Sequence, residues 1–198
     1  DPITLDLDGD GLETVGTEAG VLFDHNADGI QTGTGWIGAD DGLLVLDHNG
    51  NGTIDNGTEL FGDSTVTDSG TAETGFEALA ALDSNADGVI DANDAQFADL
   101  QVWQDSNQDG ISQADELHSL TDVGVESISL THDDVSNDHG NGNAIMETGT
   151  FNYIDIQDIQ GDVASLALAS NSFNSHFIDP VFENLETSDV YECLLKAA

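Results

Sequence analysis

The sequence predicts an α+β fold in which short strands and hairpins are combined with a paired EF-hand-like helix-loop-helix unit. Three observations lead to this prediction. An acidic loop motif recurs along the chain, short apolar runs lie between Gly- and Asn-rich turns in the first 50 residues, and apolar side chains show helical spacing within 75–120. We expect one module over residues 1–178 and a tail over 179–198 that is either helical or disordered.

Strand periodicity begins at residues 3–8, where Ile3, Leu5 and Leu7 alternate with polar side chains. A period of two indicates a half-buried strand. Further strands are expected where apolar runs lie between turn residues, at 21–23, 36–37, 43–46, around 128–130, and over 151–159 as half of a hairpin. Residues 163–169 fit a strand or a helix, and NDHGNGN at 137–143 fits a turn or loop.

Helical spacing is confined to the middle of the chain. Phe76, Leu79 and Leu82 recur at i, i+3 and i+6, which predicts a helix entering the acidic loop that follows. A second short helix is expected from Ala92 to about Leu100. Together with residues 58–62, the region 75–120 is therefore expected to carry the helical portion of the fold.

The charge balance is extreme, with 40 acidic residues against one Lys or Arg and a formal net charge of −39. Such a surface repels phosphate groups, which excludes nucleic-acid binding and a polybasic membrane anchor. No apolar run approaches the ~18–20 residues of a membrane span, so membrane insertion is not expected. Leu, Ile, Val and Phe make up about 26% of the chain, above the roughly 20% below which disorder is expected. The acidic residues therefore either lie spread over a hydrated surface, as in a salt-adapted protein, or are neutralised by something other than side chains, for which hard divalent cations are the obvious candidates.

The motif D-x-[DN]-x-[DN]-G occurs five times, starting at Asp6, Asp24, Asp47, Asp83 and Asp105. The frequencies of Asp, Asn and Gly would produce about 0.15 occurrences by chance. Ca²⁺ takes about 6–8 oxygens; residues 1, 3 and 5 of such a loop point oxygens at one centre, and position 7 offers its carbonyl. Glycine at position 6 permits the sharp turn. The motif therefore predicts a calcium-dependent fold that holds three to five Ca²⁺ ions.

Two loops complete the EF-hand pattern because an acidic residue stands at position 12. The ligands expected in loop 83–94 are Asp83, Asn85, Asp87, the carbonyl of Val89, and Asp94. Those expected in loop 105–116 are Asp105, Asn107, Asp109, the carbonyl of Ile111, and Glu116, the preferred bidentate ligand.

The other three loops carry only the first half of the motif. The third loop offers Asp47, Asn49, Asn51, the carbonyl of Thr53, Asp55, and Glu59 one residue later than the standard spacing. The first loop offers Asp6, Asp8, Asp10 and the carbonyl of Leu12, with either Glu13 or a remote residue to complete the shell. The second loop offers Asp24, Asn26, Asp28 and the carbonyl of Ile30, and nothing acidic follows within it. For the loops that start at Asp6 and Asp24, the alternative is an Asx-rich turn that joins strands.

Both prolines follow an aspartate, as Asp1-Pro2 and Asp179-Pro180. The carboxylate of such an Asp can reach its own main-chain carbonyl carbon and close a five-membered anhydride. An intramolecular nucleophile reaches an effective molarity of about 10⁵–10⁸ M, so a fold that aligns the carboxylate could cut this bond unaided. Asp1-Pro2 is the stronger candidate because it lies immediately before the first acidic loop.

The run DPITLDLDGDGLETVG at 1–16 resembles the start of the self-processing module of FrpC-type RTX proteins from Gram-negative bacteria. The resemblance continues through 22–63, 75–117 and 140–143, and covers about residues 1–178. It implies a secreted module that meets calcium outside the cell and then cleaves the Asp-Pro bond at its own N-terminal border. By position, Asp1 would be the nucleophile and cleaved residue, and Pro2 the leaving side.

The resemblance also implies that the new C-terminal aspartate is an anhydride, which water hydrolyses or a lysine ε-amine captures as an isopeptide cross-link. Such a module acts once rather than turning over as an enzyme. Its first partner would be the upstream segment of its own polypeptide; because the chain begins at Asp1, we expect an excised or matured form. Lys196 is the only lysine, so a cross-link acceptor is expected on another protein.

A second reading belongs to a different class of function: a non-catalytic, calcium-folded structural or interaction module of a secreted RTX adhesin or toxin. Both readings place the chain outside the cell or at its surface.

The histidines carry weaker signals. His132, Asp134 and His139 lie within eight positions and could hold a transition metal. We favour a solvated polar loop, because no helical or hairpin spacing fixes these side chains. His25 and His48 occupy position 2 of acidic loops, which normally points outward.

Overall fold

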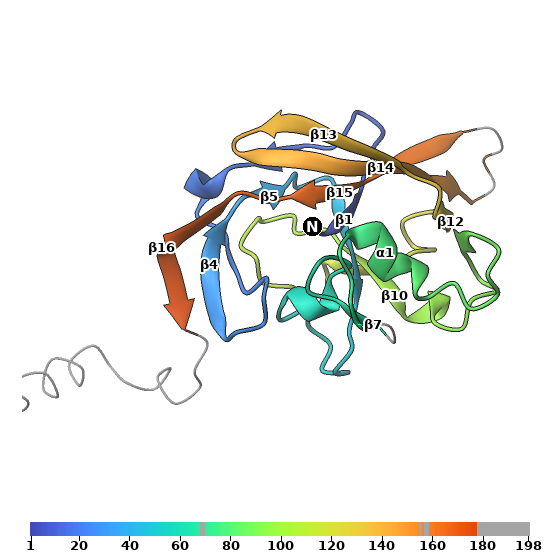
Figure 1. Ribbon diagram of the computed structural model, residues 1–198, viewed down its shortest axis with the longest axis horizontal. Helices are drawn as coiled ribbons and strands as arrows, with labels where there is room; N and C mark the ends of the chain where they lie inside the picture. The colour runs from blue at the N-terminus through green and yellow to red at the C-terminus, as the bar shows by residue number, and fades with distance from the viewer. Residues whose placement is uncertain (68–69, 155, 157–158, 178–198) are drawn as a thin grey trace, which may run out of the picture.

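In the computed structural model, the residues whose placement is described are 1–67, 70–154, 156 and 159–177. Nine antiparallel strands form a curled sheet, ordered β11-β10-β6-β1-β15-β14-β12-β9, with β13 also paired to β14 (Figure 1). These strands are β1 (Ile3–Leu5), β6 (Gly42–Leu46), β9 (Val89–Ile90), β10 (Leu100–Trp103), β11 (Leu117–Ser119), β12 (Val125–Ser129), β13 (Asp133–Gly140), β14 (Asn143–Tyr153) and β15 (Gln160–Ala167).

Smaller sheets and short helical turns complete the described chain. One sheet has the order β16-β4-β3, and β2-β5 and β7-β8 are two-stranded. Their bounds are β2 (Thr14–Val15), β3 (Leu22–Phe23), β4 (Ile30–Thr34), β5 (Trp36–Ile37), β7 (Val66–Thr67), β8 (Gly70–Thr71) and β16 (Ser170–Phe177). The helical elements of the described residues are one α-helix, α1 (Gly75–Ala80), and the 3-10 turns η1 (Thr17–Ala19), η2 (Gly57–Glu59) and η3 (Phe97–Asp99).

Strand β6 is buried on both faces, which explains its unbroken apolar sequence GLLVL. Leu44 packs into one apolar cluster together with Ile3, and α1 covers this cluster through Phe76. Leu43 packs into a second cluster on the opposite face, around Trp36 and Trp103, whose ring centroids lie 5.4 Å apart. The sheet therefore lies between two cores, and β1 lies beside β6 at its centre.

The predicted α+β class with a paired EF-hand-like unit is wrong, because the described chain is mostly β and carries one short α-helix. The spacing of Phe76, Leu79 and Leu82 does produce α1, which is capped by the Thr74 side chain accepting from the Glu77 amide. That helix ends at Ala80, after a turn and a half, and the expected helix from Ala92 to Leu100 does not form.

Instead, residues 97–99 form a 3-10 turn and residues 100–103 form β10, which pairs with β6 on one side and β11 on the other. The i, i+3 spacing of Phe97 and Leu100 suits this turn as well as a longer helix. Residues 100–103 adopt the strand conformation because Leu100, Val102 and Trp103 are fully buried only as part of the sheet.

The strand predictions fare better. Strands are found within or around the expected ranges at 3–5, 22–23, 36–37, 42–46 and 125–129, and the ambiguous segment at 163–169 is strand through Ala167. The expected loop at 137–143 is mostly hairpin: β13 and β14 are joined at Asn141-Gly142, where both residues have positive φ. Asn-Gly is the usual two-residue hairpin turn. The tail at 179–198 lies outside the described residues.

Across the described part of the chain, no helix has the length and apolar character to cross a membrane.

Candidate functional site: acidic loops and the Asp1–Pro2 bond

The five acidic loops share one local geometry. In each, the carboxylate of the first aspartate accepts a hydrogen bond from the main-chain N–H of the glycine at position 6, at 2.8–3.0 Å. These glycines, at 11, 29, 52, 88 and 110, all have positive φ, as the motif predicts. The loop therefore closes on its own first carboxylate, and the side chains at positions 3 and 5 stand beside it.

The residues expected to close the two complete loops do return to them. Asp94 is buried and its Oδ1 accepts from the amide of Ser84, at position 2 of its loop, at 2.8 Å. Glu116 is buried likewise, and its Oε1 accepts from the hydroxyl of Ser106, at position 2 of the other loop, at 3.2 Å. Without flanking EF-hand helices, the position-12 carboxylates still return to position 2 of their loops.

The third loop is closed by Glu59, despite its shifted spacing. Glu59 is buried on η2, and its Oε2 accepts from the amide of Asp55 at 2.8 Å. Its Oε1 is buried and has no hydrogen-bond partner among the described residues. A buried carboxylate oxygen without a donor is costly, and a bound cation would offset that cost.

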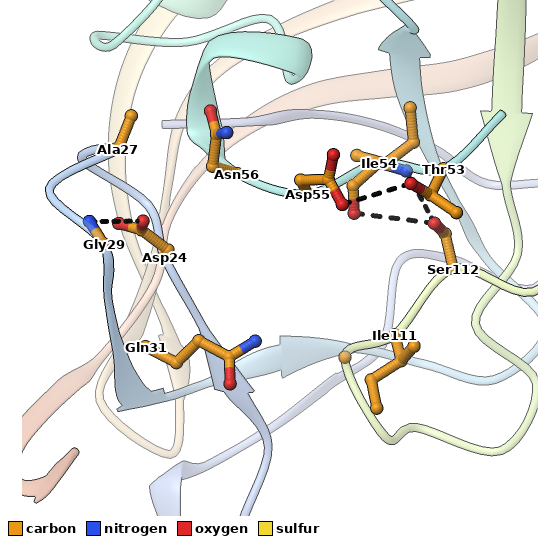
Figure 2. Close-up of a pocket in the computed structure, with 11 residues that line it drawn as sticks. Asp24, Ala27, Gly29, Gln31, Thr53, Ile54, Asp55, Asn56, Ile111 and Ser112 are labelled. Carbon is orange, nitrogen blue, oxygen red and sulfur yellow. Dashed lines mark hydrogen bonds between the residues drawn. The ribbon is translucent and has the colours of Figure 1, made fainter. Parts of the chain in front are cut away.

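The second and fifth loops lie next to the exit of the third. Together they line a hollow of about 390 Å³, with Asp24 on one side, Asp55 and Asn56 on another, and Ile111 and Ser112 on a third (Figure 2). The second loop gains no acidic residue from its own exit, as the sequence implied.

The first loop brings three carboxylates together: ligand atoms of Asp6, Asp8 and Asp10 all lie within 4.8 Å of one another. Its predicted carbonyl ligand is engaged elsewhere, since the Leu12 oxygen accepts from His139 Nε2. The structure adds a residue that the loop pattern does not contain. Asp41 is fully buried; its Oδ2 accepts from the Glu13 amide at 2.8 Å, and its Oδ1 has no partner among the described residues.

The N-terminus lies near the middle of the view in Figure 1, beside β1 and the start of α1; Asp1 is partly exposed and Pro2 is buried. The Ser165 hydroxyl donates to the Asp1 carbonyl oxygen at 3.3 Å, and the Leu166 amide donates to the Pro2 carbonyl oxygen at 3.0 Å. Both carbonyls of the dipeptide are thus held by consecutive residues of β15.

Two glycines leave room for the Asp1 carbonyl group. A Cβ added at Gly62 would lie 3.1 Å from the Asp1 carbonyl carbon, and one added at Gly75 would lie 2.9 Å from its oxygen. The Asp1 amino group lies 3.3 Å from Asp63 Oδ1, and burial lowers its pKa although Asp63 partly offsets this. The peptide is therefore enclosed by main chain from two segments distant in sequence.

Comparison with known proteins identifies the family of this chain. A model of the SPM domain family matches residues 3–169. The chain belongs to the SPM domain family. It is also 52% identical over 184 residues to the Iron-regulated protein FrpA of Neisseria meningitidis serogroup C, an alignment that covers 91% of this chain and 16% of that protein. The relationship to Frp proteins expected from the motifs is confirmed, and the matched region begins one residue after Pro2.

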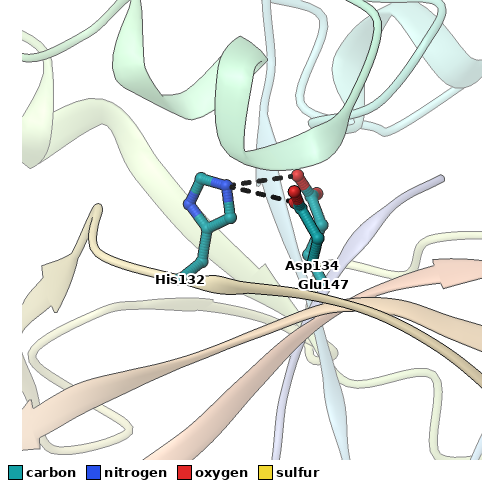
Figure 3. Close-up of side chains that lie close together, drawn as sticks. All are labelled: His132, Asp134 and Glu147. Atoms are coloured by element: carbon teal, nitrogen blue, oxygen red, sulfur yellow. Dashed lines mark ion pairs between the residues drawn. The ribbon is translucent and has the colours of Figure 1, made fainter.

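A buried carboxylate of this SPM domain lies on the same face as the Asp1 carbonyl. The antiparallel register pairs Ser165 with Ile3 on one side and with Glu147 on the other, so the three side chains share a face. Glu147 is buried, and its Oε1 lies 3.5 Å from His132 Nε2 (Figure 3). His132 also stacks on Phe76 of α1, with ring centroids 4.5 Å apart.

The histidine expectations are thereby revised. His132 and Asp134 do lie together, with 3.9 Å between Nε2 and Oδ1, but their third neighbour is Glu147 rather than His139. His25 does not point outward: its Nε2 donates to Thr34 Oγ1 at 3.0 Å, and it packs against Phe23 and Trp36. Burial lowers its pKa to about 4, so it is neutral near pH 7. His48 is exposed, as its loop position predicts.

Sequence reasoning missed Asp41, Ser165, Glu147 and the two glycines beside Asp1. The only indication of Asp41 in the sequence is indirect: the first loop has no acidic residue at position 12, so a residue from elsewhere in the chain would have to take that place. Nothing local distinguishes Ser165, which lies 164 residues from its partner Asp1.

The metal-free SPM domain is expected to be better ordered at pH 5 than at pH 8. Burial, followed by repulsion from Glu13, Asp6 and Asp40, raises the pKa of Asp41 from 3.8 to about 7. A raised carboxyl pKa means that the folded chain binds the proton more tightly than the unfolded chain, so this contribution to stability is present below about pH 4 and is lost as pH rises through about 7. Thermal unfolding in chelator, followed by circular dichroism, measures the difference. Asp41→Asn should flatten the pH dependence, and an unchanged slope would contradict the assignment.

Proposed function

We propose that this SPM domain folds on calcium and then cuts its own Asp1–Pro2 bond in a single turnover. The Asp1 carboxylate attacks the Asp1 carbonyl carbon and the C–N bond breaks. The Pro2 nitrogen takes up a proton, and a five-membered anhydride remains on the upstream fragment. Water or a lysine amine then opens the anhydride, giving a free C-terminal aspartate or an isopeptide cross-link. The observation that carries this proposal is the fixed position of the Asp1 and Pro2 carbonyls on β15, enclosed by Gly62 and Gly75.

The residues around the bond have distinct roles in this proposal. Ser165 donates to the carbonyl oxygen on which negative charge grows during attack, which is the position where a fixed donor helps most. The Leu166 amide holds the Pro2 carbonyl oxygen, so the leaving residue keeps a fixed orientation relative to the Asp1 carbonyl carbon. The close main chain at Gly62 and Gly75 leaves no room for a side chain beside the carbonyl, which restricts its movement.

We assign the proton for the leaving nitrogen to the pair formed by Glu147 and His132. His132 Nδ1 lies 2.9 Å from the Leu130 carbonyl, which can only accept, so Nδ1 carries a hydrogen. Nε2 then faces Glu147 and Asp134, at 3.5 and 3.9 Å from their carboxylate oxygens. Glu147 stands opposite Ser165 in the β14–β15 register, on the face that carries Asp1.

Calcium would be held by the acidic loops, and its charge would neutralise carboxylates that otherwise repel one another. The buried unpaired oxygens of Glu59 and Asp41 support this fit, because they lie at loop sites made entirely of oxygen ligands. Since the chain carries a single lysine, at 196, a cross-link would join the upstream fragment to another protein. The likeness to FrpC-type RTX proteins supports a secreted location, where calcium is abundant.

A fusion protein tests the proposal. An unrelated folded domain is placed upstream of residue 1, millimolar calcium is added, and the products are weighed by mass spectrometry. The expected products are an upstream fragment that ends in Asp1 and a downstream fragment that begins with Pro2. A fusion that folds on calcium and stays intact would leave the non-catalytic structural module as the better description, and cleavage at Asp179-Pro180 would mean that the assigned bond is wrong.

Ser165→Ala is expected to slow cleavage about a hundred- to a thousandfold without preventing folding, since it removes one donor to the developing oxyanion. The matched control is Thr4→Val, on the neighbouring strand. Thr4 is equally buried, and its hydroxyl has no hydrogen-bond partner among the described residues, so its loss should leave the rate unchanged. Rates measured on the fusion at saturating calcium decide the matter, and equal rates in the two variants would remove Ser165 from the mechanism.

A further inference from the structure

Asp41 stands opposite Asp6 across the centre of the sheet. The antiparallel ladder between β1 and β6 pairs Thr4 with Leu43 and Leu5 with Gly42, so the next position in the same register is Asp6 with Asp41. Both side chains are buried, at 4% exposure for Asp6 and 0% for Asp41. Like charges directly opposite each other on adjacent strands destabilise a sheet.

No basic side chain offsets this pair. The described residues contain neither Lys nor Arg, because the chain's single basic residue is Lys196. Asp6 satisfies its oxygens with the amides of Gly9 and Gly11, at 2.7 and 3.0 Å. Asp41 satisfies Oδ2 with the Glu13 amide, and Oδ1 is left buried without a donor. A buried, unpaired carboxylate oxygen facing a second carboxylate needs either a proton or a cation.

The first loop lacks ligands in the places where an EF-hand loop would have them. Position 12 is Thr17, and the position-7 carbonyl, Leu12, accepts from His139. What the loop does offer is the group of Asp6, Asp8 and Asp10, whose ligand atoms lie within 4.8 Å of one another. Asp41 continues the β1–β6 register opposite Asp6, the first member of this group.

We propose that Asp41 is the remote ligand that completes a calcium site with Asp6, Asp8 and Asp10. Four carboxylates supply enough oxygen to hold a hard divalent cation, with water or Glu13 filling the remaining positions of a shell of about 6–8. The site joins the loop after β1 to the residue that precedes β6, so the bound ion ties together the two central strands. This inference rests on the calcium-binding part of the proposed function and is independent of whether the Asp1–Pro2 bond is cut.

Counting bound calcium tests the site without reference to cleavage. Isothermal titration of the full chain with Ca²⁺ is compared with titration of Asp41→Asn and of Glu126→Gln, a control at an exposed carboxylate outside all five loops. Asp41→Asn is expected to lose one equivalent of calcium, or to weaken one site at least tenfold, whereas Glu126→Gln keeps the original count. An unchanged count and affinity in Asp41→Asn would overturn the proposal; no binding by the parent chain would instead overturn calcium folding as a whole. If Asp41→Asn does not fold, Asp41→Ser repeats the measurement.

Terbium luminescence provides a second readout at this site. Tyr153 lies close enough to Asp6 and Asp8 for their charges to raise its pKa, after the larger effect of burial, whereas Trp36 donates to Asp105 of another loop. Tb³⁺ bound at the first loop should therefore be sensitised by Tyr153, and Tyr153→Phe should remove that part of the emission. In Asp41→Asn this part should already be absent, so adding Tyr153→Phe should change nothing. An equal loss of emission in both backgrounds would show that Asp41 is not needed for the site.

Discussion

Asp1→Asn is expected to reduce cleavage of the Asp1–Pro2 bond below detection in the upstream fusion. Asparagine has nearly the shape of aspartate but lacks the carboxylate that closes the anhydride. The loss should be large, because the tethered nucleophile is worth an effective molarity of about 10⁵–10⁸ M. Release of the upstream domain at saturating calcium, followed by gel and mass spectrometry, measures it.

The same variant separates folding from chemistry. Asp1→Asn should respond to calcium with the same change in circular dichroism as the parent, since the Asp1 hydrogen bond with Ser165 is made by the main-chain carbonyl oxygen. Undiminished cleavage in a folded Asp1→Asn would rule out the anhydride.

Removing calcium is expected to unfold or expand the whole described domain. Each Ca²⁺ site at a hundredfold excess over its dissociation constant stabilises the fold by about 2.7 kcal/mol. Three to five such sites give roughly 8–14 kcal/mol, which is about the entire stability of an ordinary domain. With a net charge of −39 and almost no basic residues, little else offsets the repulsion.

Far-UV circular dichroism and size-exclusion chromatography, with and without chelator, measure this effect. The expected result is a loss of strand signal and an increase in hydrodynamic radius in chelator, both reversed by calcium. Magnesium at the same concentration is the control and should restore less, because it prefers a smaller octahedral shell. Identical spectra with calcium and with chelator would contradict calcium-dependent folding.

The acidic loops could be predicted from the sequence because their structure is local. The first aspartate bonds to an amide five residues later, as Asp105 does with Gly110, and that glycine adopts the positive φ which the spacing requires. Short strands such as 42–46 could be predicted for the same reason, since an unbroken apolar run between turns is a local signal.

The EF-hand helices could not be predicted correctly because the deciding contacts are distant. Val102 pairs with Leu44 across the sheet, and this pairing makes residues 100–103 a strand although Phe97 and Leu100 have helical spacing. No residue within 97–103 indicates that this segment will pair with the strand that contains Leu44.

The residues around the Asp1–Pro2 bond were hidden in the same way. Ser165 and Gly75 reach Asp1 only after β1, β15 and α1 have packed, and Asp41 meets Asp6 only through the register of β1 with β6. The sequence motifs therefore identified the acidic loops and the Asp1–Pro2 bond, whereas Ser165, Gly75 and Asp41 could be identified only from the folded structure.

Trapping the anhydride tests the central proposal most directly. The upstream fusion is incubated in saturating calcium with an excess of a small primary amine, and the released upstream fragment is weighed. We expect two populations, one ending in free Asp1 and one carrying the amine as an amide on Asp1, with the second growing as the amine concentration rises. An intact fusion, or a fragment that carries only the free acid at every amine concentration, would contradict cleavage through an anhydride.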